Sequence, residues 1–137
     1  MPLKIVARET LHVGQPLVVD GDSPIGRYST VFEDDGNTAY FYAIDTDVED
    51  GTPIQDALHV YNVANVTDAD RPSTLEIGWS EDGLKALLLI NDQPHAAFDF
   101  IRRQGWCQTG FPPGASRTSG WSPASRDWND EVEVLFD

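Results

Sequence analysis

Hydrophobic and polar side chains alternate with a period of two along much of the chain, and this pattern predicts β-strands. Leu75, Ile77 and Trp79 alternate with polar or small residues, as expected for a strand with one buried face. The run 84–90 is almost entirely apolar, which is typical of a central strand covered on both faces. Strands are expected at 3–13, 17–22, 28–33, 38–44, 59–66, 74–79, 84–90 and 95–101. The last six of these are expected to form the core.

Two stretches of the chain repeat one local pattern of residues. They are FEDDGNTAYFY, which begins at Phe32, and WSEDGLKALLL, which begins at Trp79. Each has an aromatic residue, an acidic run, an Asp-Gly pair and a hydrophobic segment. Glycines such as Gly36 and Gly83 supply the positive φ that tight hairpin turns require. We interpret the repeat as the same hairpin turn used twice, the second within a three-stranded meander.

Helical signals are confined to two short segments. The phrase TPIQ, residues 52–55, combines a threonine cap, a proline suited to the first helical position and the glutamine of a capping box. It predicts a short helix over Pro53–Leu58. The tail, residues 127–137, permits a short helix or a final strand, and the alternation from Val132 to Phe136 favours a strand.

The length and composition favour a single domain over residues 1–137. Residues 108–126 are rich in Gly, Pro and Ser and are predicted to form a loop within that domain. The expected fold class is α+β: one domain dominated by antiparallel sheet, built from hairpins and a meander, with one or two short helices.

Charge is the strongest compositional signal. The formal net charge is −14 at pH 7. Between Arg27 and Arg71 there is no Lys or Arg, and that interval holds ten acidic residues and all four tyrosines. Such a field repels nucleic acid and anionic membranes and attracts basic proteins. A solvated acidic face that only keeps the protein soluble is the competing interpretation.

The acidic, tyrosine-rich segment is the candidate site for a basic protein partner. Tyrosine offers a large contact area with few rotatable bonds, and surrounding carboxylates steer a cationic partner. Because Phe41 lies between Tyr40 and Tyr42, both tyrosines share one side of a strand, and either side could be the exposed one. The predicted partner-binding residues are Asp34, Asp35, Tyr40, Tyr42, Asp45, Asp47, Glu49 and Asp50.

A calcium site is the alternative interpretation of part of this segment. Asp45, Asp47, Glu49 and Asp50 resemble the start of an EF-hand loop, but Gly51 comes one place later than that loop requires. A solvated acidic loop is therefore favoured. We expect no metal and no other cofactor.

The chain has a single cysteine, Cys107, which permits no intrachain disulfide and fits a reducing compartment. It could act as a nucleophile with His59 or His95 as base, but no phrase typical of cysteine enzymes surrounds it, so a packing role is favoured. The N-terminus lacks the pattern of a signal peptide, and no apolar run approaches the roughly 20 residues that span a bilayer. We expect a cytoplasmic protein.

Several phrases occur together in an order that is familiar. They are VFEDDGNTAYFYAID, DALHVYNVANV, PSTLEIGWSEDGLKALLLINDQPHAAFDF and GWCQTGFPP, which together span Val31 to Pro113. In these phrases the chain resembles domain-of-unknown-function family 2251, a family of small bacterial proteins. The resemblance implies a bacterial, single-domain, cytoplasmic protein, and it assigns no catalytic residue.

The sequence thus favours a non-enzymatic protein that neutralises a basic partner. The concrete hypothesis is an immunity protein for a bacterial toxin, such as a nuclease, whose surface is cationic because its substrate is polyanionic. Two alternatives stay open: a small enzyme that uses carboxylates or Cys107, and a structural or regulatory subunit.

Overall fold

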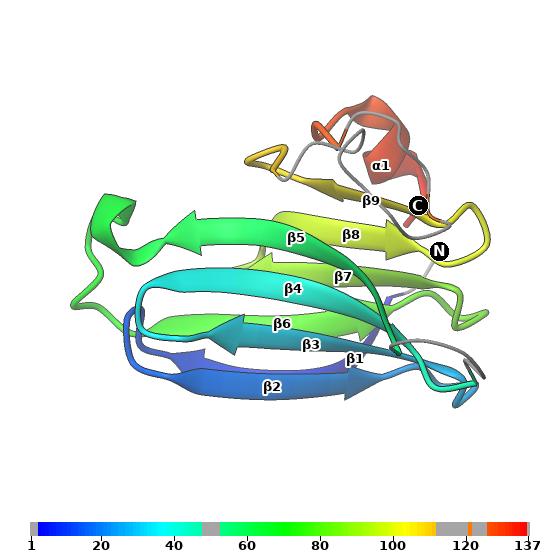
Figure 1. The fold of residues 1–137 in the computed structure, drawn as a ribbon, viewed down its shortest axis with the longest axis horizontal. Helices are drawn as coiled ribbons and strands as arrows, with labels where there is room; N and C mark the ends of the chain where they lie inside the picture. The colour runs from blue at the N-terminus through cyan, green and yellow to red at the C-terminus, as the bar shows by residue number, and fades with distance from the viewer. Residues whose placement is uncertain (1–2, 48–52, 112–120, 122–125, 137) are drawn as a thin grey trace.

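Two antiparallel β-sheets lie face to face in the computed structural model, which describes residues 3–47, 53–111, 121 and 126–136 (Figure 1). The first sheet has the order β1-β6-β7-β8-β9, with bounds Lys4–Leu11, Ser73–Trp79, Lys85–Ile90, Gln93–Asp99 and Gln104–Cys107. The second has the order β2-β3-β4-β5, with bounds Leu17–Asp22, Tyr28–Asp34, Thr38–Asp45 and Ile54–Asn62. Neighbouring strands in both sheets run antiparallel.

The inward side chains of both sheets form one hydrophobic core. Phe41 of β4 stacks on Phe98 of β8, with ring centroids 5.3 Å apart and an interplanar angle of 22°. The indole N–H of Trp79 in β6 donates to the carbonyl oxygen of Gly21 in β2 at 3.2 Å. Both contacts join the two sheets, so buried apolar area and aromatic pairing stabilise the sandwich.

A second cluster covers the β7–β9 part of the outer face of the five-stranded sheet. Trp106 of β9 and Ala97 of β8 point outward and are buried beneath Val132 of the short helix α1, Asp130–Val134. Figure 1 shows α1 at the β9 end of this sheet. The strand favoured for the tail is therefore wrong, and the helical alternative is found. Asn129 caps the helix by accepting a hydrogen bond from the Glu131 N–H at 2.8 Å.

The helix predicted over Pro53–Leu58 is also wrong, because this segment belongs to strand β5. Asp56 and Leu58 point inward and are buried, opposite Ala43 and Phe41 of β4. Pairing with β4 supplies the backbone hydrogen bonds that a helix would otherwise provide, and tertiary packing overrides the local capping signal. The strand expected over 59–66 ends early, in the 3₁₀ turn η1, Val63–Asn65.

The other expected strands are confirmed, with small shifts at their ends. Strand β9 was not predicted, because its four residues carry no clear alternation. The result is a mainly β fold with very little helix. Most of the loop predicted at 108–126 lies outside the described residues. None of the helices in the described part of the chain has the length and apolar content required to cross a lipid bilayer.

The repeated Asp-Gly phrase is confirmed as a hairpin turn used twice. Gly36 joins β3 to β4 with φ +98°, and Gly83 joins β6 to β7 with φ +71°. The preceding aspartates accept backbone hydrogen bonds: Asp35 from Asn37 and Thr38, and Asp82 from Leu84. The hydrogen bond from the Thr38 N–H is the main cause of the lowered pKa of Asp35, and the hydrogen bond from the Ser80 hydroxyl is the main cause of the lowered pKa of Asp82.

Candidate functional site: an acidic and aromatic sheet face

The outer face of the four-stranded sheet carries an array of outward side chains, here called the open face. Strand register places Val18, Glu33, Tyr40 and His59 in one row across the sheet. The neighbouring rows follow the same register. The open face consists of Val18, Asp20, Asp22, Ser29, Val31, Glu33, Tyr40, Tyr42, Ile44, Ile54, Ala57 and His59. Val18 is 59% exposed, in contrast to the covered face of the other sheet.

A chain of ring contacts crosses the open face toward β5. Tyr42 stacks on Tyr40 with centroids 6.1 Å apart, Tyr40 meets the His59 ring edge-on at 5.6 Å, and His59 meets Phe111 edge-on at 6.0 Å. We call these four residues the aromatic row. Both tyrosines are on the outward side of β4 and Phe41 is on the inward side, which resolves the question that the sequence left open.

Phe111 joins this row although it lies after β9. The backbone N–H of His59 donates to the Phe111 carbonyl at 2.9 Å, and the Thr109 hydroxyl donates to the His59 carbonyl at 3.0 Å. These bonds fasten the segment 109–111 to the edge of β5. The Phe111 side chain remains 50% exposed, so a large apolar group is available at this edge.

Three carboxylates, those of Asp20, Asp22 and Glu33, lie on the β2 and β3 strands of the open face. Asp22 accepts a hydrogen bond from the Ser29 hydroxyl at 2.7 Å, and Glu33 accepts one from the Tyr42 hydroxyl at 3.2 Å. Burial, followed by the bond to Glu33, raises the pKa of Tyr42 to about 12. No Lys or Arg stands at any position of the open face. The face is therefore both acidic and aromatic.

A hollow of about 350 Å³ lies at the β5 end of the aromatic row. The Nε2 atom of His59 lies 3.0 Å from Oδ1 of Asn62. An amide oxygen only accepts, so in this contact Nε2 is the donor. The Nδ1 atom of the same ring is buried and has no hydrogen-bond partner in the described part of the chain. The residues that line the hollow are Thr38, Tyr40, His59, Asn62, Thr109 and Phe111.

Two of the predicted acidic residues have structural roles at the β3–β4 turn. Asp34 is only 1% exposed and accepts hydrogen bonds from the Gly14 N–H at 2.8 Å, the Gly36 N–H at 2.8 Å and the Tyr61 hydroxyl at 2.6 Å. Its carboxylate is therefore turned away from any partner surface. Asp35 is exposed, but it lies in the turn rather than on the open face.

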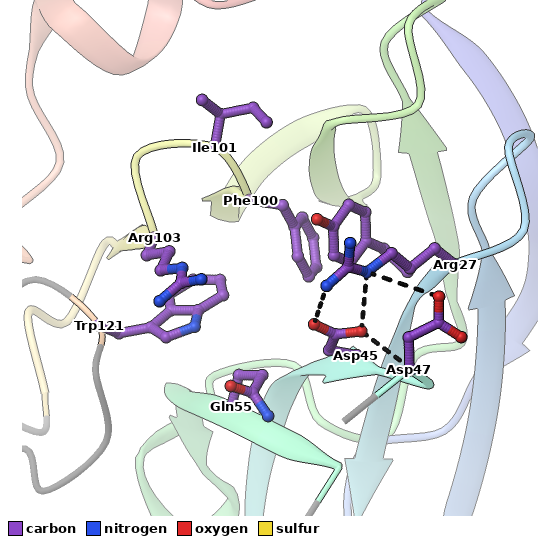
Figure 2. Close-up of a pocket in the computed structure, with 9 residues that line it drawn as sticks. Arg27, Asp45, Asp47, Gln55, Phe100, Ile101, Arg103 and Trp121 are labelled. Atoms are coloured by element: carbon purple, nitrogen blue, oxygen red, sulfur yellow. Dashed lines mark hydrogen bonds and ion pairs between the residues drawn. The ribbon is translucent and has the colours of Figure 1, made fainter. Parts of the chain in front are cut away.

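Asp45 and Asp47 lie at the far end of β4, beside Arg27 (Figure 2). The Arg27 guanidinium donates to both carboxylate oxygens of Asp45 at 3.1 Å, and it lies 3.9 Å from Asp47. This pairing raises the pKa of Arg27 and, above all other causes, lowers the pKa of Asp45. A cavity of about 390 Å³ adjoins the three residues. Their charges are partly compensated within the chain itself.

The predicted partner-binding set is thus dispersed over the molecule. Only Tyr40 and Tyr42 belong to the open face, and Glu49 and Asp50 lie outside the described residues. Sequence reasoning missed the carboxylates of Asp20, Asp22 and Glu33 and the ring of Phe111. The alternation in LVVDGD and in TVFED places Asp20, Asp22 and Glu33 on one side of their strands. The pairing of β2 with β3 is also needed to show that this side faces solvent.

The cysteine and histidines considered for an enzymatic role lie within the described residues. The Cys107 side chain is buried, with its sulfur 3.5 Å from both the Thr109 hydroxyl and the Phe111 carbonyl. Burial lowers the pKa of His95. Within the described ranges, no group of three or more His, Cys, Asp or Glu side chains is placed to hold a metal ion.

Comparison with known proteins places the chain in a family. The model of DUF2251, described as an uncharacterized protein conserved in bacteria, matches residues 11–137. An uncharacterized protein of Haemophilus influenzae is 42% identical over 111 residues, which cover 80% of this chain and 68% of that relative. No solved structure matches the chain. Since the family model covers nearly the whole sequence, the chain belongs to the DUF2251 family of bacterial proteins.

Proposed function

We propose that this chain is a binding protein that docks a basic protein partner on the open face. The observation that carries the proposal is the difference between the two outer faces of the sandwich. The helix α1 and its neighbours cover the β7–β9 part of the outer face of the five-stranded sheet, whereas the open face presents tyrosines, carboxylates and exposed apolar groups. A sheet face with exposed large apolar side chains, which no element in the described part of the chain covers, is typical of an interaction surface.

Charge complementarity supports a basic partner. Glu33 lies beside Tyr40 of the aromatic row, Asp20 and Asp22 lie on β2 of the same face, and no Lys or Arg stands on the open face. Carboxylates steer a cationic protein and fix its register, while buried aromatic side chains supply most of the affinity. This division of labour suits a surface that combines both kinds of residue.

The narrower form of the proposal is neutralisation of a bacterial toxin, with a nuclease as the leading example. A nuclease binds a polyanion and therefore exposes cationic surface. A small acidic protein from a bacterial family can cover that surface. The open face provides an acidic and aromatic docking area for such a surface.

The test measures association of the purified protein with the partner recovered from its native bacterium. Asp20→Lys and Glu33→Lys reverse charge on the open face, and Glu81→Lys makes the same change in the exposed β6–β7 turn. We expect the first two variants to slow association at least tenfold at low salt and the control to leave it nearly unchanged. Equal effects of all three variants, together with a hydrogen-exchange footprint confined to β8, β9 and α1, would overturn the proposal.

A further inference from the structure

We infer that the outer edge of strand β2 receives an extended segment of the partner, which adds to the four-stranded sheet as an antiparallel strand with basic side chains opposite Asp20 and Asp22. The inference rests on the proposed function, which requires only a basic partner, and it adds the place and the mode of docking. Three features carry it: the outward backbone groups of β2, the state of the other sheet edges and the carboxylates along β2.

Every second residue of β2 has its backbone groups turned away from its own sheet. The Ser23 N–H, just beyond β2, donates to the Tyr28 carbonyl at 2.9 Å, and the Thr30 hydroxyl of β3 donates to the Gly21 carbonyl at 3.2 Å. Ser23 and Gly21 therefore face β3. This orientation alternates along an antiparallel pair, and the register of β2 with β3 has no shift. The N–H and C=O groups that face the outer edge are those of Val18, Asp20 and Asp22.

No strand of the described residues pairs with this outer edge. Strand β2 ends the order of its sheet, and Figure 1 shows it as the outermost strand beside β3. A row of unpaired N–H and C=O groups is a template for one more strand. The indole of Trp79 holds β2 against the core through its hydrogen bond to Gly21, so the template is fixed in position before a partner binds.

The other three sheet edges are covered or irregular in the described part of the chain. At the β5 edge the His59 N–H donates to the Phe111 carbonyl at 2.9 Å, and at the β9 edge the Cys107 N–H donates to the Arg126 carbonyl at 2.9 Å. Strand β1 contains one extra residue, Val6, where its register with β6 shifts, and such bulges protect an edge from pairing. Strand β2 has no bulge, no proline and no lysine, so it lacks these protections.

The charges along β2 favour a basic segment over a second copy of the chain. The side chains of Asp20 and Asp22 are exposed on the open face. In an antiparallel pair, the side chains of opposite residues lie on the same side of the sheet, so Lys or Arg opposite these positions meets the carboxylates. A second copy would bring its own two aspartates to the edge, and like charges across two strands are destabilising.

The geometry also determines which N–H groups of the partner strand form the pairing bonds. Asp20 and Asp22 face the edge with their backbone groups, so each forms a hydrogen-bonded pair, in which two opposite residues exchange both N–H···O bonds. The basic residues of the partner therefore supply these N–H groups themselves. The residues between them turn their N–H groups away from β2.

The test uses a heptapeptide with capped ends, in which Thr and Lys alternate from a first Thr, and two N-methylated forms of it. One form is methylated on the backbone nitrogens of the three Lys residues, and the other on those of the last three Thr residues. All three peptides have the same charge. Dissociation constants with the full chain are measured at low salt by NMR titration. We expect methylation at Lys to weaken binding about tenfold or more, because the pairing N–H groups are lost, and methylation at Thr to weaken it less than about threefold.

Hydrogen exchange locates the added strand. At saturating unmodified peptide, we expect the amides of Val18, Asp20 and Asp22 to exchange about tenfold more slowly than in the free protein. The amides of Val19 and Gly21 already face β3 and should change little. Equal binding of the two methylated peptides, a reversed order, or unchanged exchange of the three outward amides would overturn the inference.

Two variants of one residue provide a further comparison. Val18→Pro removes an outward N–H, whereas Val18→Ala shortens the same side chain and keeps that N–H. We expect the proline variant to bind the unmodified peptide more weakly than the alanine variant. The comparison of methylated peptides uses the wild type, so it holds even if Val18→Pro fails to fold.

The outcomes separate this inference from the proposed function. If all three peptides bind equally and Asp20→Lys weakens each of them, a basic partner is still supported and strand addition is refuted. If the unmodified peptide does not bind, strand addition is refuted, and association with the native partner alone decides the proposed function. Protection of the outward amides that rises with the concentration of the protein alone would show that a second copy occupies the edge, which also refutes the inference.

Discussion

At the scale of single residues, adjacent acids have unrelated roles. Asp34 and Asp35 are neighbours in the sequence, yet the first is buried among three donors and the second caps an exposed turn. The alternation of side chains along β3 causes this difference, because Asp34 lies on the inward side of the strand together with Phe32. A sequence in which both positions are aspartate gives no reason to separate them.

The bond from Tyr61 to Asp34 leads to a first prediction. Tyr61→Phe removes a 2.6 Å hydrogen bond to a buried carboxylate, and we expect a loss of about 1.5–3 kcal/mol in the free energy of unfolding. Tyr40→Phe is the control, because no hydrogen bond of its hydroxyl occurs in the described structure, and it should change stability little. Urea denaturation of both variants measures the difference. Equal stability of the two variants would remove the structural role assigned to Asp34.

A second prediction concerns Tyr42. Its pKa is raised to about 12 by burial and by Glu33, whereas an unfolded tyrosine titrates near 10. A raised pKa means that neutral Tyr42 stabilises the fold fully below pH 10, and that this contribution is lost as the pH rises through 12. Glu33→Gln should lower this pKa without restoring it fully, since burial remains. Ultraviolet titration against a Tyr42→Phe reference checks both values.

At the scale of elements, the sequence predicted most strands but not their partners. Alternation marks a strand with a local signal, whereas the pairing of β1 with β6 joins residues far apart in the chain. The error at β5 has the same origin. Asp56, which reads as a helical surface residue, is buried against Arg126 with an N–O distance of 2.8 Å, a contact that no local pattern predicts.

The two Asp-Gly turns provide a third prediction. Both glycines have positive φ, but a Cβ at Gly83 would lie 2.6 Å from the Ser23 hydroxyl, whereas one at Gly36 would have no neighbour closer than 3.7 Å. Both Gly→Ala variants should lose about 1 kcal/mol or more through backbone strain, and Gly83→Ala should lose more through the clash. Thermal melts compare the stability of the two variants. A lower melting temperature for Gly36→Ala than for Gly83→Ala would contradict this account.

At the scale of the whole molecule, α1 covers the β7–β9 part of one outer face of the sandwich, whereas no helix or strand of the described residues covers the open face. Charge and tyrosine content predicted that an acidic aromatic surface exists. They did not predict its members, because the fold alone places Asp20 on the open face and Phe111 at its β5 edge.

A fourth prediction tests the cover. Val132→Asp places a charge in the buried contact between α1 and Trp106, whereas Val134→Asp makes the same change at a position that is 65% exposed. We expect the first variant to lose about 2–4 kcal/mol of stability and to self-associate through the uncovered sheet. The second variant should remain close to the wild type. Analytical ultracentrifugation and chemical denaturation distinguish them, and identical behaviour would contradict the covering role of α1.

The position of the two chain ends has a practical consequence. Leu3 and Phe136 both pack into the cluster on the outer face of the five-stranded sheet, on the opposite side of the sandwich from the open face. An affinity tag, a fluorescent fusion or a biotin anchor at either end would therefore emerge behind the candidate docking surface. A sensor chip loaded through one terminus would present the tyrosines and carboxylates to the solution, so attachment through either end should yield the same kinetics.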